Sequence, residues 1–194
     1  MREAKESEVR RLVREAVDRA LGPPAAPGAA PQVVPAPQLV RAAAPRRVSI
    51  GSDHGGFALK EVLKRAIADD LGWEVHDCGT HSTDAVDYPD LAAAVAREVA
   101  SGRSSHGVIV DAAGIGSSIA ANKVAGVRCA LCHDDATVLN SREHNDANVL
   151  ALGARVVNRG AASRMVRLFL TTPFGGGRHE RRVQKIVALE QRPA

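Results

Sequence analysis

A glycine-rich segment near the middle of the chain has the residue types needed to bind an anion. Residues 111–118 read DAAGIGSS and lie between a β-branched run and a stretch of helical periodicity. A loop that leads from a strand into a helix directs backbone N–H groups and the positive helix end toward an anion. We therefore expect Gly114, Gly116, Ser117 and Ser118 to contact such a group, although a tight turn that needs glycine stays an open alternative. A dinucleotide site is disfavoured, because neither G-x-G-x-x-G nor G-x-x-x-x-G-K-[ST] occurs.

Three further side chains are candidates for proton transfer. His144 is one candidate, because histidine is the side-chain type suited to accepting and returning a proton near neutral pH. Asp53 and Asp111 each follow a short β-branched run, where ligands bind at the carboxyl ends of strands. The Asp111 carboxylate can act as a base if desolvation raises its proton affinity. A lone histidine at a helix end is more often a cap or a surface residue, so His144 alone is weak evidence.

Basic residues near the C-terminus indicate a small phosphorylated ligand. Arg178 and Arg182 are four residues apart, so on one helix their guanidinium groups would converge on a phosphate. A solvated basic helix face is the alternative. The chain carries a formal net charge of +4 and a pI near 9.3, but only 3% of its residues are aromatic. With so few aromatic side chains to stack on bases, nucleic acid is not the expected partner.

After Arg47, short β-branched runs alternate with longer segments of helical periodicity. This alternation predicts an α/β fold, a Rossmann-like three-layer α-β-α sandwich with a parallel sheet of about five strands. Because ligands bind outside the carboxyl ends of parallel strands, we expect Asp53-His54, the 111–118 loop and His144-Asn145 to meet there. The expected strands are 48–50, 73–75, 107–110, 127–131 and 149–152, and the expected helices are 57–68, 88–100, 117–122, 136–142 and 161–170.

The residues before this domain, which we place at 47–194, have a different character. Residues 1–21 are predicted to form an amphipathic helix that ends at Gly22-Pro23-Pro24. Residues 22–46 read as a Pro/Ala-rich flexible linker. A helix this short is marginal alone in water, so we expect it to dock on a partner, on a second copy or on its own domain. Acidic and basic residues nearly balance on its polar face, which disfavours a membrane surface.

Cysteine and histidine usage favours a reducing cytoplasm and no metal site. The chain has 3 cysteines, which cannot all pair, and it shows neither a signal peptide nor a long apolar stretch. Cys129 and Cys132 form a C-x-x-C inside an apolar run without a second pair, so we interpret them as buried strand cysteines. The 7 histidines show no recognisable metal-ligand spacing, and no metal is expected.

Five ordered blocks of this sequence resemble the ribose-5-phosphate isomerase B family, over about three quarters of the chain. Such agreement in order is far more specific than any one short block. The blocks are GSDHGG at 51–56, DYP at 87–89, DAAGIGSSIAANK at 111–123, SREHNDANV at 141–149 and GRHERRV at 177–183.

The resemblance implies isomerisation of a phosphorylated sugar, ribose 5-phosphate to ribulose 5-phosphate, through ring opening and an enediolate, with no metal or organic cofactor. It implies that His144 opens the ring with Asp53 as its partner at the ring oxygens, and that the 114–118 loop stabilises the enediolate. It also implies a homodimer in which the phosphate ligands act on a substrate held by the partner subunit; whether dimers pair into tetramers stays open. By the same resemblance His54, Tyr88 and Asn145 line the sugar pocket, and Arg178, Arg182, Arg155 and His179 bind the phosphate.

The chain departs from this family at the base. One branch of the family has a cysteine where this chain has Asp111, and another has a glutamate at the position of Ser117. The threonine expected two residues after the cysteine is Ala113 here. Three explanations stay open: Asp111 is the base, the substrate is another phosphosugar or related anion, or the site binds its ligand without turnover.

The N-terminal segment carries a second resemblance. An amphipathic helix joined by a Pro/Ala-rich linker to a metabolic enzyme resembles the encapsulation peptides that direct cargo into bacterial microcompartments, and isomerases of this family occur as such cargo. The resemblance implies that residues 1–21 contact a shell protein and that the protein lies inside a microcompartment of the cytoplasm.

Overall fold

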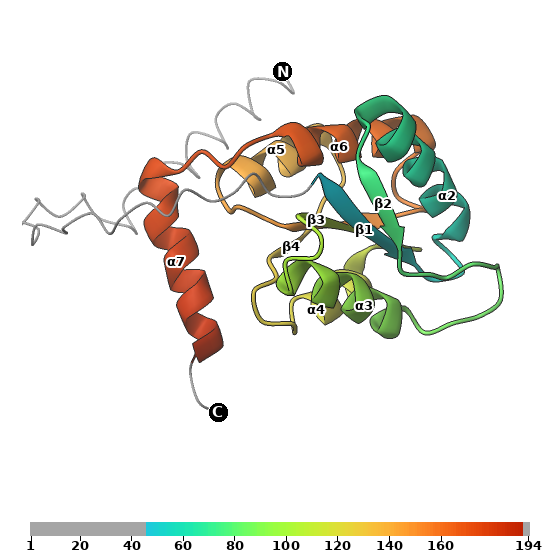
Figure 1. Cartoon of the computed structure of the whole chain (residues 1–194), viewed down its shortest axis with the longest axis horizontal. Helices are drawn as coiled ribbons and strands as arrows, with labels where there is room; N and C mark the ends of the chain where they lie inside the picture. The colour runs from blue at the N-terminus through green and yellow to red at the C-terminus, as the bar shows by residue number, and fades with distance from the viewer. Residues whose placement is uncertain (1–45, 192–194) are drawn as a thin grey trace, which may run out of the picture. The chain divides into compact units, whose positions relative to one another are not determined.

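β-branched segments build a parallel sheet in the part of the chain that the computed structural model describes, residues 46–191 (Figure 1). Within these residues the sheet has 5 strands in the order β2-β1-β3-β5-β4, and every neighbouring pair is parallel. Parallel strands need crossover connections, which helices supply here. The predicted α/β sandwich is confirmed. The strands are β1 (Arg47–Ser52), β2 (Glu74–Asp77), β3 (His106–Asp111), β4 (Cys129–Leu131) and β5 (Val149–Gly153).

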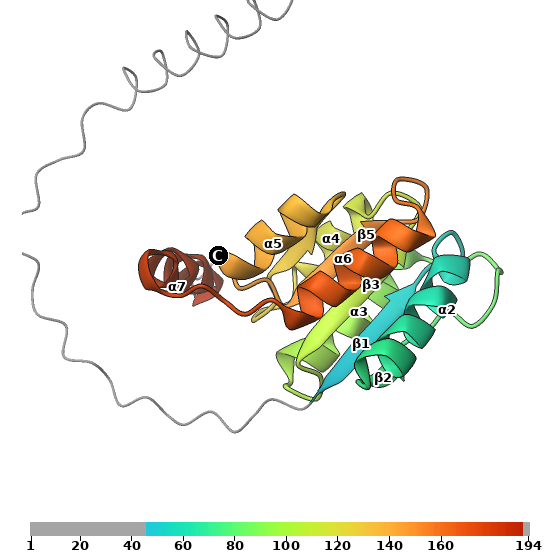
Figure 2. The same cartoon turned by 90° about the horizontal axis from the view of Figure 1, so that it is seen from above.

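Helices cover both faces of this sheet. One face packs against α2, α5 and α6, and the other against α3 and α4 (Figures 1 and 2). Along β3, Val108 and Val110 face the first layer and Ile109 faces the second, so the strand is apolar on both sides. The helices are α2 (Phe57–Arg65), α3 (Tyr88–Ala100), α4 (Ile115–Ala121), α5 (Asp135–Glu143), α6 (Arg159–Thr171) and α7 (Glu180–Ala188).

Local sequence explains most helix boundaries. α3 begins and ends at the predicted residues, and Pro89 in its first turn explains where it begins. α5 begins with a capping box in which the Asp134 side chain accepts from the Thr137 N–H. The expected helix 57–68 is instead α-helical to Arg65 and continues as a π-helical turn over Ala66–Asp70.

The C-terminal helix α7 extends beyond the sheet (Figures 1 and 2). It follows Gly176 and Gly177, whose φ angles are 59° and 56°. Arg178 lies in the 3₁₀ turn Gly177–His179, which runs directly into α7, and Arg182 lies in α7. The two arginines are therefore on adjoining helical turns of different type, and not on one α-helix as their spacing predicted.

The predicted amphipathic helix, residues 1–21, lies outside the described residues. The predicted linker 22–46 also lies outside them, except for Arg46.

Candidate active site

Asp53 and Asp111 lie next to each other where β1 and β3 end. Ser52 pairs with Val110 in the sheet register, so the two aspartates occupy the next matching positions. The Asp53 N–H donates to the Val110 carbonyl at 3.3 Å. Both aspartates are largely buried, with 8% and 5% of their surface exposed. The carboxyl edge of the sheet thus brings together two of the three residues predicted for proton transfer.

The Asp111 carboxylate is held by the loop that follows it. Its Oδ1 accepts hydrogen bonds from the N–H groups of Ala113, at 2.8 Å, and Gly114. Its Oδ2 accepts from the Ser117 N–H at 3.1 Å. Gly114 has a φ of 80°, a conformation that favours glycine and turns the loop back over the aspartate. These N–H groups are among those we expected to face a bound anion, and in this structure an internal carboxylate occupies them.

Tyr88 and His54 lie at the same edge. A Cβ atom added to Gly116 would come within 2.5 Å of the Tyr88 ring, so the ring packs directly on the glycine-rich loop. Tyr88 remains 41% exposed, which leaves it available to a ligand. The ring Nδ1 of His54 lies 3.4 Å from the Val86 N–H and accepts from it. The segment that leads into α3 is thereby joined to the end of β1.

Ser117 and Ser118 are placed differently from each other. The Ser117 side chain is buried, and its Oγ has no hydrogen-bond partner among the described residues. The Ser118 Oγ donates to the Ile115 carbonyl at 2.8 Å within its own helix. Neither hydroxyl is held by another candidate residue of the site.

His144 and Asn145 lie at the amino ends of the strands, opposite to Asp53 and Asp111 at the carboxyl ends, contrary to our expectation. α5 runs back from the end of β4, and His144 caps it before the chain enters β5 at Val149. Val149 pairs with Gly107, whereas Asp111 pairs with Gly153 at the far end of the same strand. Four steps along a strand span about 13 Å. A residue that precedes a parallel strand lies at its amino end, and this topology separates His144 from both aspartates.

Three predicted phosphate ligands, Arg178, His179 and Arg182, lie near His144. The rings of His144 and His179 stack with centroids 4.1 Å apart, and the Arg178 Nε donates to the His179 Nε2 at 3.3 Å. Partial burial lowers the pKa of His179, and the nearby charges of His144, Arg178 and Arg182 lower it further. We call His144, Asn145, Arg178, His179 and Arg182 the amino-edge cluster.

Arg155 belongs to the other edge. Its backbone N–H donates to the Ala112 carbonyl at 3.0 Å, next to Asp111. The four predicted phosphate ligands are therefore divided between the two edges within one chain. We call Asp53, His54, Tyr88, Asp111, Gly114, Gly116, Ser117, Ser118 and Arg155 the carboxyl-edge cluster.

Arg142 braces the amino-edge cluster, although it was not among the predicted site residues. Arg142 is only 7% exposed, and its guanidinium pairs with the Asp146 carboxylate at 3.1 Å. Its Nε donates to the Thr172 carbonyl at 3.2 Å, which ties the segment leading to His179 to the His144 turn. Asp146 has a φ of 46°, unusual for a residue other than glycine. The sequence signal was its place inside the matched block 141–149.

Lys60 has a similar supporting role at the carboxyl edge. Its side chain is fully buried, and its Nζ donates to both Asp77 oxygens and to the Thr80 carbonyl at 2.7 to 2.8 Å. The Thr80 N–H in turn donates to the Ser52 carbonyl at 2.8 Å, directly before Asp53. Burial raises the pKa of Asp77, but hydrogen bonds from Lys60 and Lys64 outweigh it and lower the pKa to about 2.

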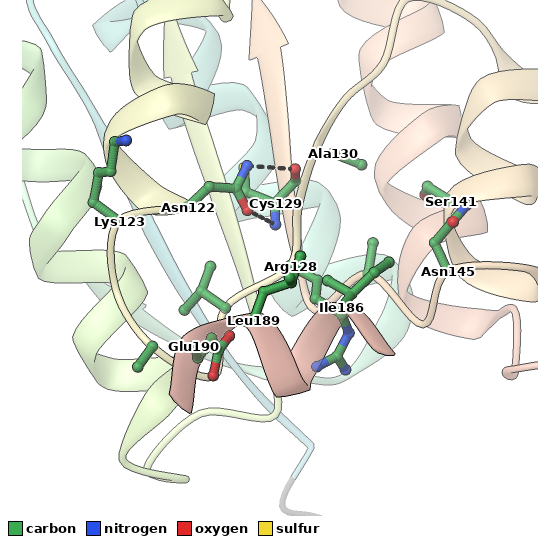
Figure 3. A pocket seen from close by; sticks show the side chains of 13 residues that line it. Asn122, Lys123, Arg128, Cys129, Ala130, Ser141, Asn145, Ile186, Leu189 and Glu190 are labelled. Atoms are coloured by element: carbon green, nitrogen blue, oxygen red, sulfur yellow. Dashed lines mark hydrogen bonds between the residues drawn. The ribbon is translucent and has the colours of Figure 1, made fainter. Parts of the chain in front are cut away.

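A cavity of about 660 Å³ lies between the end of α7 and the loop that leads into β4 (Figure 3). Asn145 lines it, as do Arg128, Ile186 and Leu189. Asn122 closes one wall through hydrogen bonds to the Cys129 backbone at 2.8 and 2.9 Å. The cavity therefore adjoins the amino-edge cluster and not the two aspartates.

The cysteines are thiols with raised pKa values. Burial raises the pKa of Cys78 to about 11 and that of Cys129 to about 12, and within the described residues all three cysteines are free. Residues 46–191 contain no group of three or more His, Cys, Asp or Glu side chains that could hold a metal ion. No helix in this described range has the length and apolar character to cross a bilayer.

Comparisons with known proteins agree with this architecture. The family model described as Ribose/Galactose Isomerase matches residues 48–186. The chain is 43% identical over 147 residues to the ribose-5-phosphate isomerase B of Escherichia coli strain K12, which covers 76% of this chain and 98% of that protein. Residues 1–47 lie outside the family match.

Solved structures show the same similarity. The ribose-5-phosphate isomerase B of Clostridium thermocellum is 49% identical with a TM-score of 0.70, over 75% of this chain and 97% of that one. The type B ribose 5-phosphate isomerase of Trypanosoma cruzi is 44% identical with a TM-score of 0.73, over 75% and 97% of the two chains.

Proposed function

The chain belongs to the ribose/galactose isomerase family, and from this membership we propose that it interconverts ribose 5-phosphate and ribulose 5-phosphate. The observation that carries the proposal is the pair of clusters described above. The carboxyl-edge cluster offers carboxylates next to a glycine-rich loop, and the amino-edge cluster offers a histidine next to arginines. An aldose–ketose isomerase needs both sets, one for proton transfer and one for ring opening and phosphate binding.

The roles follow from the chemistry of each group. His144 donates and accepts the proton that opens the furanose ring, with a carboxylate at the ring oxygens. Arg178 and Arg182 bind the phosphate, assisted by His179 and Arg155, because guanidinium groups match phosphate oxygens. His54, Tyr88 and Asn145 line the sugar, and the Gly114–Ser118 loop faces the enediolate.

The substrate is bound between two copies of the chain. A five-carbon sugar phosphate is roughly 8 Å long from its bond lengths, shorter than the separation of about 13 Å between the two sheet edges. One copy therefore cannot bring His144 and Asp53 to the same sugar. A homodimer in which each site combines one carboxyl-edge cluster with the partner's amino-edge cluster resolves this separation.

A heterodimer experiment tests this arrangement. Asp53→Asn and His144→Ala are co-expressed with different tags, and the doubly tagged heterodimer is purified and assayed for ribose 5-phosphate conversion. One of its two sites contains neither substitution, so we expect about half of the wild-type activity, while each homodimeric variant is inactive. An inactive heterodimer beside an active wild type would show that His144 and Asp53 act within one chain.

A second candidate function is binding of a phosphosugar or related anion without turnover, or turnover of a different phosphosugar. The observation that favours it is the engagement of both Asp111 oxygens, in a chain that has neither the cysteine nor the glutamate base. A wild-type protein that binds ribose 5-phosphate but does not convert it would establish this second candidate. Where conversion is seen, His144→Ala purified in the same way excludes a contaminating isomerase.

For residues 1–21 we keep the proposal of a targeting helix that meets a microcompartment shell protein in the cytoplasm. Its support is the amphipathic pattern of the sequence and its position outside the family match. Deletion of residues 1–46 is expected to abolish association with shells and to leave isomerase activity and dimerisation unchanged. Loss of activity on deletion would instead assign the segment to the catalytic assembly.

A further inference from the structure

The two aspartates at the carboxyl edge differ in how much of each carboxylate is free to accept a proton. A carboxylate oxygen has two lone pairs, and a base must direct one of them toward the C–H bond of the substrate. Two neighbouring carboxylates in different environments commonly divide the acid and base roles between them. The hydrogen bonds of Asp53 and Asp111 therefore indicate which of the two carboxylates is free to act as the base.

The Asp111 carboxylate has few lone pairs left to accept a proton. Its Oδ1 receives two backbone N–H groups, from Ala113 and Gly114, which fills that oxygen. Its Oδ2 receives the Ser117 N–H, and only 5% of the residue is exposed. To reach a sugar the carboxylate would have to give up hydrogen bonds that shape the loop. Asp111 is better suited to hold the loop than to exchange protons.

Asp53 keeps one oxygen free. Its Oδ1 accepts the Gly56 N–H at 2.9 Å, which fixes the orientation of the carboxylate. No described residue donates a hydrogen bond to its Oδ2. This oxygen is not fully buried and therefore reaches solvent. Asp53 forms no salt bridge with any residue in the range 46–191 that would neutralise it.

The space in front of Asp53 also borders the glycine-rich loop. A Cβ atom placed on Gly55 would lie 3.3 Å from the Asp53 Oδ1 and 3.5 Å from the Ala112 Cβ. The space beside Gly55 therefore lies between the Asp53 carboxylate and the Ala112 side chain, which directly follows Asp111. A sugar carbon at that point would contact both Asp53 and the segment after Asp111.

From this contrast, and resting on the proposed function, we infer that Asp53 is the base that moves the proton between C1 and C2, and that Asp111 is a positioning residue. Starting from ribulose 5-phosphate, the Asp53 carboxylate removes a proton from C1, the C–H electron pair forms the C1–C2 double bond, and the electron pair of the C2–O2 double bond passes to O2. The protonated Asp53 then returns the proton to C2, the hydroxyl proton of O1 passes to O2, and the C1–O1 double bond of ribose 5-phosphate forms. The reaction needs no oxidant, reductant or further reactant.

Ribulose 5-phosphate separates this role from ring opening. Its O5 carries the phosphate and cannot close a furanose on C2, so the substrate is already open. A carboxylate that serves only the ring oxygens is dispensable for removing the C1 proton, whereas the base is not. The measurement is the consumption of ribulose 5-phosphate by the full-length protein, together with deuterium uptake at C1 in D₂O.

Asp53→Asn is expected to lower both rates by about a thousandfold, the usual contribution of a general base. The asparagine Oδ1 still accepts the Gly56 N–H, so the fold is retained, and binding of ribulose 5-phosphate should change by less than about threefold. Asp111→Asn keeps an acceptor for Ala113 and Gly114 but loses the one for Ser117, and we expect a loss of only about tenfold. Its pH–rate profile should keep the wild-type shape, which Asp53→Asn should abolish. Asp69→Asn, an exposed carboxylate in the π-helical turn, is the control.

The reverse pattern would overturn the inference. If Asp53→Asn retains at least a tenth of the C1 exchange while Asp111→Asn loses it, Asp111 is the base and Asp53 acts only on the ring. A wild-type protein that neither consumes ribulose 5-phosphate nor exchanges its C1 proton would overturn the proposed function itself, and with it this inference.

Discussion

The imidazole rings of His144 and His179 lie almost parallel, with centroids 4.1 Å apart and planes 5° from parallel. They come from the end of α5 and the turn before α7, and the Gly175 N–H joins the two segments by donating to the Glu143 carbonyl at 2.9 Å. Two cationic rings at this distance would repel each other, and the charge of His144 is one of the causes that lower the pKa of His179. A bound anion would change that balance.

We predict that phosphate binding takes up protons. The pKa of His179 is lowered in the free protein by partial burial and by His144, Arg178 and Arg182. A phosphate dianion next to the ring favours its protonated form and raises this pKa, so the ring should take up a proton at pH values near and below the ordinary 6.5. Calorimetry of inorganic phosphate binding in two buffers of different ionisation enthalpy measures the net proton change, which includes any proton that the phosphate itself loses. The uptake by His179 is the difference between the wild type and His179→Gln at the same pH, and equal proton changes in the two proteins would contradict the prediction.

Arg178→Gln and Arg182→Gln are each expected to raise the KM for ribose 5-phosphate by about 10- to 100-fold with a smaller effect on kcat. A charge-assisted hydrogen bond to phosphate is worth about 1.5–3 kcal/mol. Steady-state kinetics measures both constants. Arg103→Gln is the matched control, because Arg103 pairs with Glu98 at 2.7 Å on the exposed surface. Equal changes in all three variants would point to a general effect of charge.

Gly116→Ala should lower kcat/KM by up to about a hundredfold, because a misplaced pocket residue costs that much in well-oriented sites. The added Cβ would lie 2.5 Å from the Tyr88 ring and must displace it. Gly160→Ala provides the control, since its nearest neighbour would be the Asn158 Oδ1 at 3.6 Å. Wild-type kinetics in Gly116→Ala would show that the position of Tyr88 is unimportant.

Asp77 should make the protein sensitive to acid. Its pKa is about 2 in the folded state, below the ordinary value of 3.8, so its stabilisation is present above pH 3.8 and is lost as the pH falls toward 2. The difference corresponds to about 2 kcal/mol. Urea unfolding at pH 7 should show Asp77→Asn to be destabilised by about 3 kcal/mol or more, since Lys60 stays buried without its partner. The variant should lose less additional stability than the wild type between pH 4 and 2, and parallel acid profiles would contradict this.

His106 should produce a second pH dependence at higher pH. Burial, and then the charge of Arg142, lower its pKa to about 4. A folded pKa below the ordinary 6.5 means that stability is fully present above pH 6.5 and is lost as the pH falls toward 4. Trp73, the only tryptophan, lies 5.8 Å from the His106 ring and reports unfolding by fluorescence. In His106→Phe the free energy of unfolding should change little between pH 7 and 5, whereas a wild-type slope would contradict the assignment.

Local signals predicted the elements well. α3 was predicted from Tyr88 to Ala100 with both bounds correct, because a proline in its first turn and a helical apolar period lie within the segment itself. The end of α2 was missed, because nothing in residues 66–70 distinguishes a π-helical turn from the α-helix before it. The 3₁₀ turn that contains Arg178 was missed, because spacing alone does not distinguish it from the α-helix that follows.

The sequence by itself determined which side chains are available to the site and which elements present them, because periodicity, caps and motif blocks are local properties of the chain. It also determined that one family of isomerases shares these blocks. Only the tertiary structure decided where the side chains lie. It places His144 at the amino ends of the strands and Asp53 and Asp111 at the carboxyl ends, and both Asp111 oxygens accept backbone hydrogen bonds. Those relationships depend on strand order and register, which are set by packing between segments far apart in the chain.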